Sequence, residues 1–351
     1  MIVLREAGEK DLEALERLSS IAAEKHPGFL NLQSDREQWK EKIGRSVQTF
    51  SDSISDKMLG KYLFVAEDVS KSPSVVVGCS MIASQHGTPE SPHFFFEVGT
   101  ENKYSQTIST GFIHGTLKLR YDTDGPTEIG GLLVDPEYRN FKERIGRQIS
   151  FVRFLYMGMH KSKFKRRVLA ELLPPLTKKG KSPLWEAVGR RFTNMDYTEA
   201  DILSSKNKEF ILSLFPSGKI YVTFLPAEAR NAIGKVSKDT EPVMHMLKKA
   251  GFQYRDQVDP FDGGPHLIAN IDEIIPMRKI RASMYGGEDA EKNKSPDVVA
   301  GLVTVKNKGD RKFSSVSVSA VFSGDKIYFA RDAAEYCGIS LSEPVVFMPF
   351  Y

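Results

Sequence analysis

The sequence predicts an α/β (α+β) fold with two successive α/β units and a small all-β tail. Helical apolar spacing alternates with short β-branched and aromatic runs through the first 283 residues. A similar order of segments begins again near residue 161. After residue 284 the helical spacing stops, and apolar and polar residues alternate instead. We therefore expect units at 1–160 and 161–283, followed by a linker and a small β-barrel-like tail at 284–351.

The first unit is predicted as strand, helix, antiparallel strands, strand and helix. Leu12, Leu15, Leu18 and Ile21 have the spacing of one helix face. A loop containing Ser and Pro separates two apolar runs that should pair as neighbours. The predicted strands are 1–7, 61–68, 74–84, 94–100, 115–121 and 127–136, and the predicted helices are 9–26 and 147–160.

The second unit and the tail follow from their own local signals. Ser182 followed by Pro183 is a helix-start signal, and Gly251 is a helix-end signal after a segment that begins at Thr240. The linker at 284–297 is charged and glycine-rich. The predicted helices are 182–192 and 240–252, and the predicted strands are 166–173, the two halves of 253–272, and four short runs beyond residue 297.

Composition excludes several classes of protein. Hydrophobic residues make up 40% of the 351 residues, which is typical of a folded chain. The net charge of +4 comes largely from two local runs, at 160–167 and 176–181, which disfavours a nucleic-acid groove. The two cysteines form no CxxC pair, so neither a zinc site nor a disulfide framework is expected. The charged N-terminus is no signal peptide and no apolar run reaches about 20 residues, so we expect a cytoplasmic protein without membrane spans.

A basic corner between residues 128 and 157 is the clearest candidate binding site. An apolar strand leads there into a helix, whose first amides and dipole favour an anion. Arginine side chains would reach phosphate oxygens, and Gly146 would let the backbone approach a ligand. Taken alone, the pattern equally fits a solvated charged loop. The basic side chains of the corner are Arg139, Lys142, Arg144 and Arg147.

Two carboxylates are further candidates. Glu171 interrupts an apolar strand, where it either needs a partner or faces outward. Asp262 precedes two glycines in "FDGGP", where it either forms a turn or faces a cationic substrate.

The histidines look less promising from sequence alone. His245 and His266 are expected on the surface. The remaining candidates, His86, His93 and His114, show no metal-ligand spacing, so no metal is expected.

Longer runs of sequence connect this order of elements with a known family. The succession of strand, helix, meander, strand, basic turn and helix resembles the GNAT acyltransferase fold. Four runs together resemble the arginine N-succinyltransferase family over nearly the whole chain, and the resemblance implies tandem GNAT-like units with a mixed, mostly antiparallel sheet. The runs are "EIGGLLVDPEYR", "SPLWEAVGRRFTNMDYTEAD", "KIYVTFLPAEARNAIGKV" and "AGFQYRDQVDPFDGGP".

The resemblance implies an N-acyltransferase that moves a succinyl group from succinyl-CoA to the α-amino group of arginine, the first step of bacterial arginine catabolism to glutamate. It implies succinyl-CoA as co-substrate, no metal, and a homo- or hetero-oligomer. The amine would enter near Glu171, Asp262, Gly263 and Gly264. The acyl-CoA positions would be Leu132, Leu133 and Val134 for the thioester arm, and Arg139, Arg144, Gly146 and Arg147 for the phosphates.

Three departures from the family pattern bear on catalysis. The family's phosphate turn resembles R-x-x-G-x-G, whereas here the turn is two residues longer and Arg144 replaces its first glycine. Ser237 stands at the position of the family's proposed proton-donating histidine, and serine has no pKa suited to that role. Leu173 replaces an arginine two residues after Glu171. Two alternatives therefore stay open: an acyltransferase with another amine or acyl-CoA, or a catalytically silent ligand-binding relative.

Overall fold

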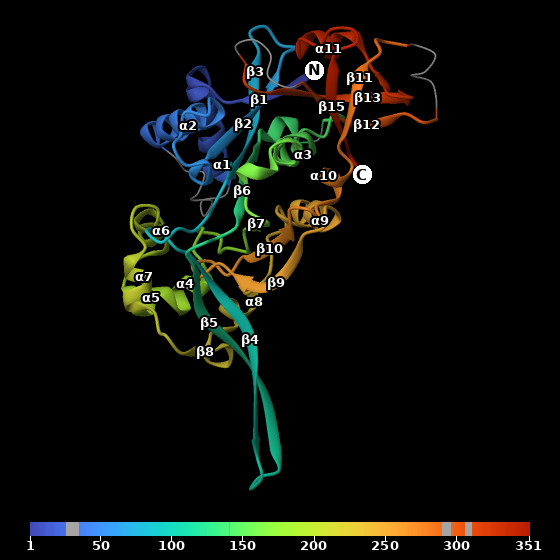
Figure 1. Ribbon diagram of the computed structural model, residues 1–351. Coiled ribbons are helices and arrows are strands. Elements are labelled where there is room, and N and C mark those ends of the chain that lie inside the picture. Colours follow the sequence, from blue (N-terminus) through green and yellow to red (C-terminus); the bar gives the residue numbers. More distant parts are fainter. Residues whose placement is uncertain (26–34, 140, 290–295, 306–310) are drawn as a thin grey trace.

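The computed structural model describes residues 1–25, 35–139, 141–289, 296–305 and 311–351 (Figure 1). Its described strands join in one mixed sheet, in which only the pairs β6–β7 and β11–β14 are parallel. The predicted mixed, mostly antiparallel sheet is thus confirmed. The strands are β1 Ile2–Glu6, β2 Lys61–Asp68, β3 Val75–Ala83, β4 His93–Ser105, β5 Thr110–Asp122, β6 Thr127–Val134, β7 Arg167–Glu171, β8 Lys219–Tyr221, β9 Gln253–Val258, β10 Pro265–Asn270, β11 Arg281–Tyr285, β12 Val299–Thr304, β13 Ser314–Ser323, β14 Lys326–Tyr328 and β15 Pro344–Pro349.

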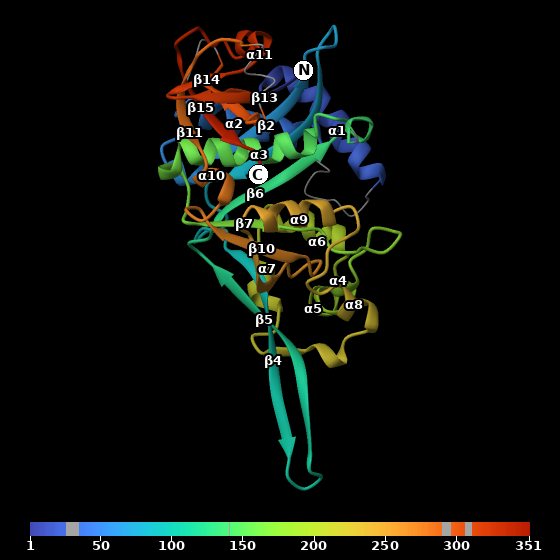
Figure 2. The same cartoon turned by 90° about the vertical axis from the view of Figure 1, so that its right-hand side faces the viewer.

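Helices cover both faces of the N-terminal part of this sheet (Figures 1 and 2). Leu63 and Val65 of β2 pack with α1 and α2, whereas the intervening Phe64 packs with α3 on the opposite face. Sequence periodicity did not reveal α2. The helices are α1 Leu12–Lys25, α2 Arg36–Phe50, α3 Ile145–Met159, α4 Pro183–Ala187, α5 Gly189–Thr193, α6 Tyr197–Ser204, α7 Glu209–Leu214, α8 Ala227–Ala232, α9 Glu241–Lys249, α10 Ile275–Arg278 and α11 Arg331–Tyr336.

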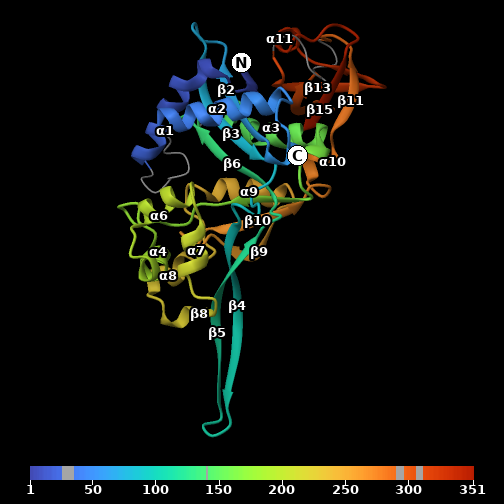
Figure 3. The ribbon, with the colours of Figure 1, turned by 60° about the vertical axis from the view of Figure 1, so that its left-hand side comes forward.

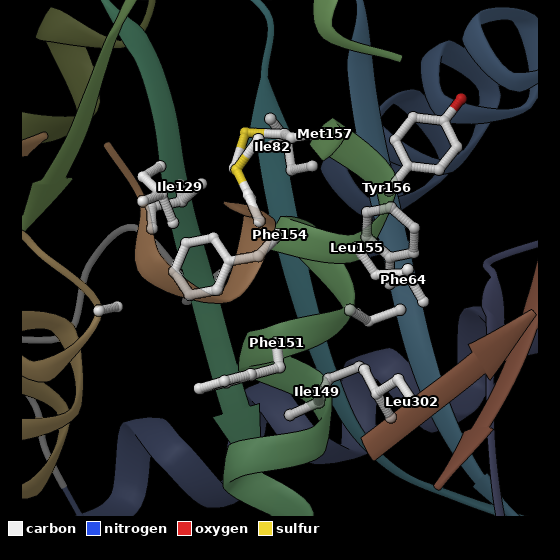
Figure 4. Close-up of a cluster of buried hydrophobic side chains, with 14 of the residues drawn as sticks. Phe64, Ile82, Ile129, Ile149, Phe151, Phe154, Leu155, Tyr156, Met157 and Leu302 are labelled. Carbon is white, nitrogen blue, oxygen red and sulfur yellow. The ribbon is translucent and has the colours of Figure 1, made fainter. Parts of the chain in front are cut away.

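The central helix α3 is buried along most of its length (Figure 4). Phe151 and Phe154 are fully buried, and they share one core with Ile129 of β6 and Leu302 of β12. Because α3 contacts the sheet on one side and the C-terminal strands on another, its N-terminus is held rigidly at the end of β6.

The sheet continues from the first predicted unit into the second through a short parallel contact. β6 and β7 pair only at Thr127–Val168 and Glu128–Leu169, and then separate. β10 and β9 follow β7 in the sheet, and α9 packs through Leu247 on the same core as α3. The unit boundaries at residues 160 and 283 stay a prediction.

A second core lies under the short helices α4–α8. Trp185 is fully buried, as its helical spacing predicts, and its ring stacks on Phe261 at 4.8 Å. The predicted helix at 182–192 is divided at Val188, where φ −122° and ψ −74° end α4. Ser182 caps α4 as expected, accepting a hydrogen bond from the amide of Trp185 at 3.0 Å.

Strands β4 and β5 are much longer than the sequence predicts. They form a hairpin that projects away from the rest of the molecule in all three views (Figures 1, 2 and 3). Among the described strands, others pair only with its root: β9 pairs with β4 at Phe96 and Glu97, and β8 pairs with β5 from Thr116 to Lys118.

The predicted C-terminal β appendage is confirmed. Five strands close a ring, because they pair in the order β12–β15–β11–β14–β13 and β13 pairs back with β12. Strand β13 also pairs with β1. The predicted linker at 284–297 begins inside β11, and its residues 290–295 lie outside the described part of the chain. Among the described residues, no helix has the length and hydropathy needed to cross a membrane.

Candidate functional site

A cavity of about 1460 Å³ occupies the space that opens between β6 and β7. Its walls come from both predicted units: β6 and the N-terminus of α3 on one side, and β7, α6, α9 and the β9–β10 turn on the other. The two strands stop pairing after Glu128 and Leu169, so backbone groups beyond these residues face the cavity instead of each other.

Strand β6 carries a β-bulge at the cavity. Its register with β3 moves from Leu133–Cys79 to Gly130–Met81, so Gly131 and Leu132 together oppose one residue of β3. Gly131 has φ +59°, and a Cβ there would lie 2.8 Å from Cγ of Met81. Glycine is therefore required at this bulge, which turns the backbone of Leu132 away from the regular ladder.

The basic corner forms a second wall of the cavity, beside the bulged part of β6. Ile145 and Gly146 open α3, and the first amides of a helix point out of its N-terminus. Arg144, the N-cap, is exposed and left-handed, with φ 49° and ψ 56°. The residue at the family's first glycine therefore adopts a conformation that suits glycine better than arginine. Nε of Arg139 donates to the carbonyl of Val134 at 3.4 Å, which draws this side chain back toward β6.

Arg147 has the most constrained guanidinium of the corner. It lies 4.2 Å from the ring centre of Phe350, and its buried Nε has no hydrogen-bond partner in the described part of the chain. Burial and the neighbouring Arg144 lower the pKa of Arg147. A bound anion would satisfy the buried donor and offset the repulsion between the two arginines.

Five carboxyl groups line the opposite end of the cavity. Burial raises the pKa of Asp259, and burial together with repulsion by neighbouring carboxylates raises the pKa of Asp201 to about 7. The same two causes raise the pKa of Glu171 and Asp262 well above their usual range. Glu128 differs: His86 and Lys61 lower its pKa to about 2, against the effect of burial. Lys208 is the cation that opposes several of these carboxylates at once. Such a pocket favours a cationic ligand.

The turn between β9 and β10 fixes two of these carboxylates. Oδ1 of Asp259 accepts from the amides of Phe261 and Asp262 at 2.7 and 3.0 Å. Asp262 in turn accepts from the amide of Gly264 at 2.7 Å. Gly263 has φ +82°, and a Cβ on Gly264 would lie 2.2 Å from the carbonyl oxygen of Leu172. The two glycines therefore shape the turn, while both aspartates line the cavity.

Three histidines gather beside Glu171 and Glu128. Nδ1 of His86 lies 2.8 Å from Oε2 of Glu128, and Nδ1 of His93 lies 3.7 Å from Oε1 of Glu171. Nε2 of His266 lies 3.5 Å from the same Glu171 oxygen. The expectation that His266 lies on the surface is wrong: its side chain is fully buried in β10, and neither ring nitrogen has a hydrogen-bond partner among the residues that the structure describes. Burial lowers the pKa of His266 to about 3 and that of His93 well below its usual value.

This histidine cluster also has the spacing of metal ligands, which the sequence did not reveal. The ligand atoms of His86, His93 and Glu171 lie within 4.8 Å of one another, as do those of Glu171, Asp259 and His266. Neutral imidazoles and carboxylates are the ligands that a divalent transition metal prefers.

Ser237 lies at the junction of the two ends. Its amide donates to the carbonyl of Leu173 at 2.9 Å, just after β7. Its hydroxyl is 2.8 Å from Oγ1 of Thr240, the N-cap of α9. The side chain is half-buried on the cavity wall and already has a local hydroxyl partner.

Most of the site residues expected from sequence line this single cavity, but Gly263 and Gly264 do not. The residues that line it are Leu132, Leu133, Val134, Arg139, Arg144, Gly146, Arg147, Glu171, Ser237 and Asp262. Sequence reasoning missed Glu128, Asp201, Asp259 and Lys208, together with the α2 side chains Lys42 and Arg45. Glu128, like Glu171, is a carboxylate in an apolar strand, and this signal is visible in the sequence.

Comparisons with known proteins identify the family of the chain. A family model described as "Arginine N-succinyltransferase beta subunit" matches residues 2–276. The arginine N-succinyltransferase of Yersinia enterocolitica is 33% identical over 326 residues, which cover 93% of this chain and 92% of that protein. The corresponding protein of Escherichia coli O17:K52:H18 is 34% identical over 282 residues, 80% and 79% of the two chains. The solved arginine/ornithine succinyltransferase subunit AI of Pseudomonas aeruginosa is similar at a TM-score of 0.83 and 27% identity, over 99% of this chain and 98% of that one. The chain belongs to the arginine N-succinyltransferase family.

Proposed function

We propose that this protein is an acyltransferase that moves the succinyl group of succinyl-CoA to the α-amino group of arginine. One observation carries the proposal: a single cavity joins a cationic end at the start of α3 to a carboxylate-lined end at the β9–β10 turn. The product bond would form where β6 and β7 separate, between these two ends. Relatives over most of the chain have the name arginine N-succinyltransferase.

The acyl-CoA would lie along β6, with its phosphates at the basic corner. The bulge at Leu132 offers backbone groups to the amides of the pantetheine arm, and Leu133 and Val134 continue that edge. The α3 amides with Arg144 and Arg147 would bind the pyrophosphate, and Arg139 supplies further positive charge. A Cβ added at Gly146 would have only Val134 within 4 Å, at 3.8 Å, so the space beside this backbone is open to a phosphate.

The arginine would enter at the carboxylate end. Its guanidinium matches carboxylates such as Asp262, Asp259 and Asp201, whose charged forms are destabilised until a cation arrives. The α-ammonium would lie near Glu171, which is the nearest of the expected residues to the point where β6 and β7 separate.

In the reaction the neutral amine attacks the thioester carbonyl, a C–N bond forms, the C–S bond breaks, and CoA leaves as the thiolate, which takes up the proton that the nitrogen loses as the amide forms. Glu171, with its raised pKa, would take the proton that the ammonium loses. Ser237 would not act as a general acid, and the thiolate, with a reference pKa of about 8.5, leaves without one. Placing both substrates in one cavity would supply much of the rate.

A thiol-release assay with succinyl-CoA, run with arginine, ornithine and other amines, tests this function. Release with arginine supports the proposal. Release only with a different amine or acyl-CoA supports an acyltransferase of other specificity, which the substituted positions Ser237 and Leu173 leave open. If no pair gives release but calorimetry detects CoA binding, the chain is a silent ligand-binding relative.

The cellular setting follows from the same proposal. An enzyme that uses succinyl-CoA works where CoA thioesters are made, which places it in the cytoplasm. Both cysteines, Cys79 and Cys337, are buried free thiols, as a reducing compartment allows. Its partners would be the amine and the acyl-CoA, with no nucleic acid or membrane.

A further inference from the structure

Two histidines and a glutamate meet on one wall of the cavity. His86 follows β3, His93 opens β4 and Glu171 ends β7, and all three line the cavity. Their possible ligand atoms lie within 4.8 Å of one another. Segments far apart in the sequence thus bring three metal-binding side chains together, beside a space from which a small ligand can approach.

The separation between His93 and Glu171 suits a shared ion better than a hydrogen bond. Nδ1 of His93 lies 3.7 Å from Oε1 of Glu171, beyond the range of an ordinary hydrogen bond. Two ligands of a tetrahedral ion with bonds of about 2.1 Å lie roughly 3.4 Å apart. The pair therefore already has nearly the spacing that one ion requires.

Glu128 holds His86 in the way that a metal-binding histidine is usually held. Its Oε2 lies 2.8 Å from Nδ1 of His86, so Nδ1 carries the proton and the other ring nitrogen keeps its lone pair. A carboxylate behind the imidazole fixes the ring and increases its basicity as a ligand. The backbone is held as well, since the amide of His86 donates to the carbonyl of Pro126 at 2.7 Å.

The buried His266 is an independent indication of a ligand at Glu171. It stands opposite Glu171 in the β10–β7 pairing, and its Nε2 lies 3.5 Å from Oε1 of that glutamate. Its ring is fully buried, and neither nitrogen has a hydrogen-bond partner in the described part of the chain. Such an unpaired buried group costs free energy. An ion that fixes the carboxylate of Glu171 would also give the imidazole of His266 a stable acceptor.

We propose that His86, His93 and Glu171 bind a divalent transition-metal ion such as Zn²⁺, with a further position open to the cavity. Two imidazoles and a carboxylate suit such ions, whereas Mg²⁺ and Ca²⁺ prefer oxygen ligands alone. The neighbouring set of Glu171, Asp259 and His266 is less suitable. Oδ1 of Asp259 already accepts from two backbone amides, and His266 is not part of the cavity lining. Sequence spacing did not show the site, because its ligands come together only in the folded chain.

Titration of the full chain with Zn²⁺ against a chromogenic chelator tests the site. We expect one ion per chain, with a dissociation constant of about 1 µM or lower. His86→Ala and His93→Gln each remove a ligand and should weaken binding at least about 30-fold, whereas Glu128→Gln keeps all three ligands and should weaken it about tenfold. His114→Ala is the matched control, because this histidine is partly exposed and lies outside the cavity lining. Mg²⁺ in excess should not displace the Zn²⁺.

Two results would overturn the proposal. One is a wild type that binds no Zn²⁺ at about 10 µM, well above the expected dissociation constant. The other is wild-type affinity in either histidine variant, because the ion would then be bound elsewhere. His86→Ala keeps the test decisive even if the buried His93→Gln variant unfolds, since the side chain of His86 is 24% exposed.

The ion should compete with the amine, a consequence that rests on the proposed function. The α-ammonium is placed near Glu171, and an ion on that carboxylate would exclude it. Titration with Co²⁺, followed by its visible absorption, measures this competition. Arginine at about ten times its dissociation constant should weaken Co²⁺ binding about tenfold. Glycine chelates the ion through the same α-amino acid group but lacks the guanidinium, so it is the control and should have a smaller effect.

The outcomes separate the metal site from the proposed function. Equal effects of arginine and glycine would overturn the shared use of Glu171. Zn²⁺ binding that depends on both histidines supports the metal site even if no amine accepts a succinyl group, and that failure would then count against the proposed function alone. Succinyl transfer by a wild type that binds no Zn²⁺ would overturn the metal site and leave the proposed function intact.

Discussion

Glu128 of β6 and Leu169 of β7 are the last residues at which the two parallel strands pair. From that point the sheet opens into the cavity, with the bulged end of β6 on one side and Glu171 at the end of β7 on the other. A strand that loses its neighbour exposes amides and carbonyls that need new partners. The separation therefore leaves backbone groups at this edge that a ligand with amide groups would pair with.

The side chain of Leu132 should matter little for CoA binding, because its expected contribution is its backbone. Leu132→Ala should leave the calorimetric dissociation constant for CoA within about threefold, since the deleted side chain is only partly buried against the core. Leu132→Pro removes the amide hydrogen and should weaken binding at least about tenfold. The opposite order, with the alanine variant weak and the proline variant normal, would mean that the side chain makes the contact.

Arg144 should serve ligand binding at the expense of stability. Its left-handed conformation costs roughly 1 kcal/mol for a residue with a side chain, and glycine avoids that cost. Arg144→Gly should therefore raise the free energy of unfolding by about 1 kcal/mol in urea titrations while weakening CoA binding about tenfold. Arg144→Ala should weaken CoA binding equally without the gain in stability.

The comparison of these two variants separates the roles of backbone and side chain. Equal stability of the glycine and alanine variants would contradict the strained backbone. Unchanged CoA affinity in both would remove Arg144 from the phosphate site.

Ser237 should be dispensable for chemistry. Its hydroxyl already has a partner in Thr240, and serine cannot exchange a proton with a leaving thiolate near neutral pH. Ser237→Ala should keep kcat within about threefold in the thiol-release assay, since only one neutral hydrogen bond is lost. A loss of about 100-fold, with CoA affinity unchanged, would instead place the hydroxyl in the transition state.

The residues that the sequence predicts for the first end of the site line one cavity, because the signals that bring them together are local. A strand, a basic turn and a helix start lie within 30 residues, and the chain needs no long-range information to bring Arg144 and Leu132 together. The tail's alternation likewise predicted its strands. Helix α2 was missed because its segment is polar over most of its length, and its helical start depends on the Asp35 cap.

The carboxylate-lined end of the cavity is assembled by pairing between strands that are far apart in the sequence, and no local sequence pattern reveals such pairing. His266 was misplaced because its turn looks exposed in sequence, whereas β10 lies between β7 and β9 and buries it. Asp201 comes from a helix and Asp259 from a turn 58 residues later, so their shared pocket exists only after the sheet forms. The sequence also predicted β4 and β5 too short. Their outer residues mix polar and apolar side chains and have no buried face, so no regular pattern marks them as strands.

A buried ion triad should contribute strongly to the stability of the first unit. Arg5 is almost fully buried, and its guanidinium lies 2.7 Å from Asp11 and 2.6 Å from Glu67. Glu67→Gln leaves that guanidinium with one charged partner and should lower the free energy of unfolding by about 3 kcal/mol in urea. Glu97→Gln, which alters an exposed pair with Arg120, is the control and should change it by less than about 1 kcal/mol. Equal effects would show that burial adds nothing to the triad.

Arginine should stabilise the protein more at pH 8 than at pH 6. The pKa of Asp201 is raised to about 7 from an unfolded value near 3.9, so its contribution to stability is complete below the unfolded value and is lost as pH rises through 7. Raised pKa values of Asp262 and Glu171 act in the same direction. A bound guanidinium favours the charged carboxylates, so arginine binding should recover this loss at high pH. Thermal unfolding with and without saturating arginine measures both effects.

Asp201→Asn tests whether this carboxyl is part of the linkage. An amide of the same shape does not titrate, so the variant without ligand should keep more of its stability between pH 6 and pH 8 than the wild type. It should also gain less from arginine at pH 8, because one charged partner of the guanidinium is gone. Glu199→Gln on the same helix α6 is the matched control, since its exposed side chain lies outside the cavity lining. A larger arginine effect at pH 6 than at pH 8 would mean that the carboxylate end of the cavity does not receive the cation.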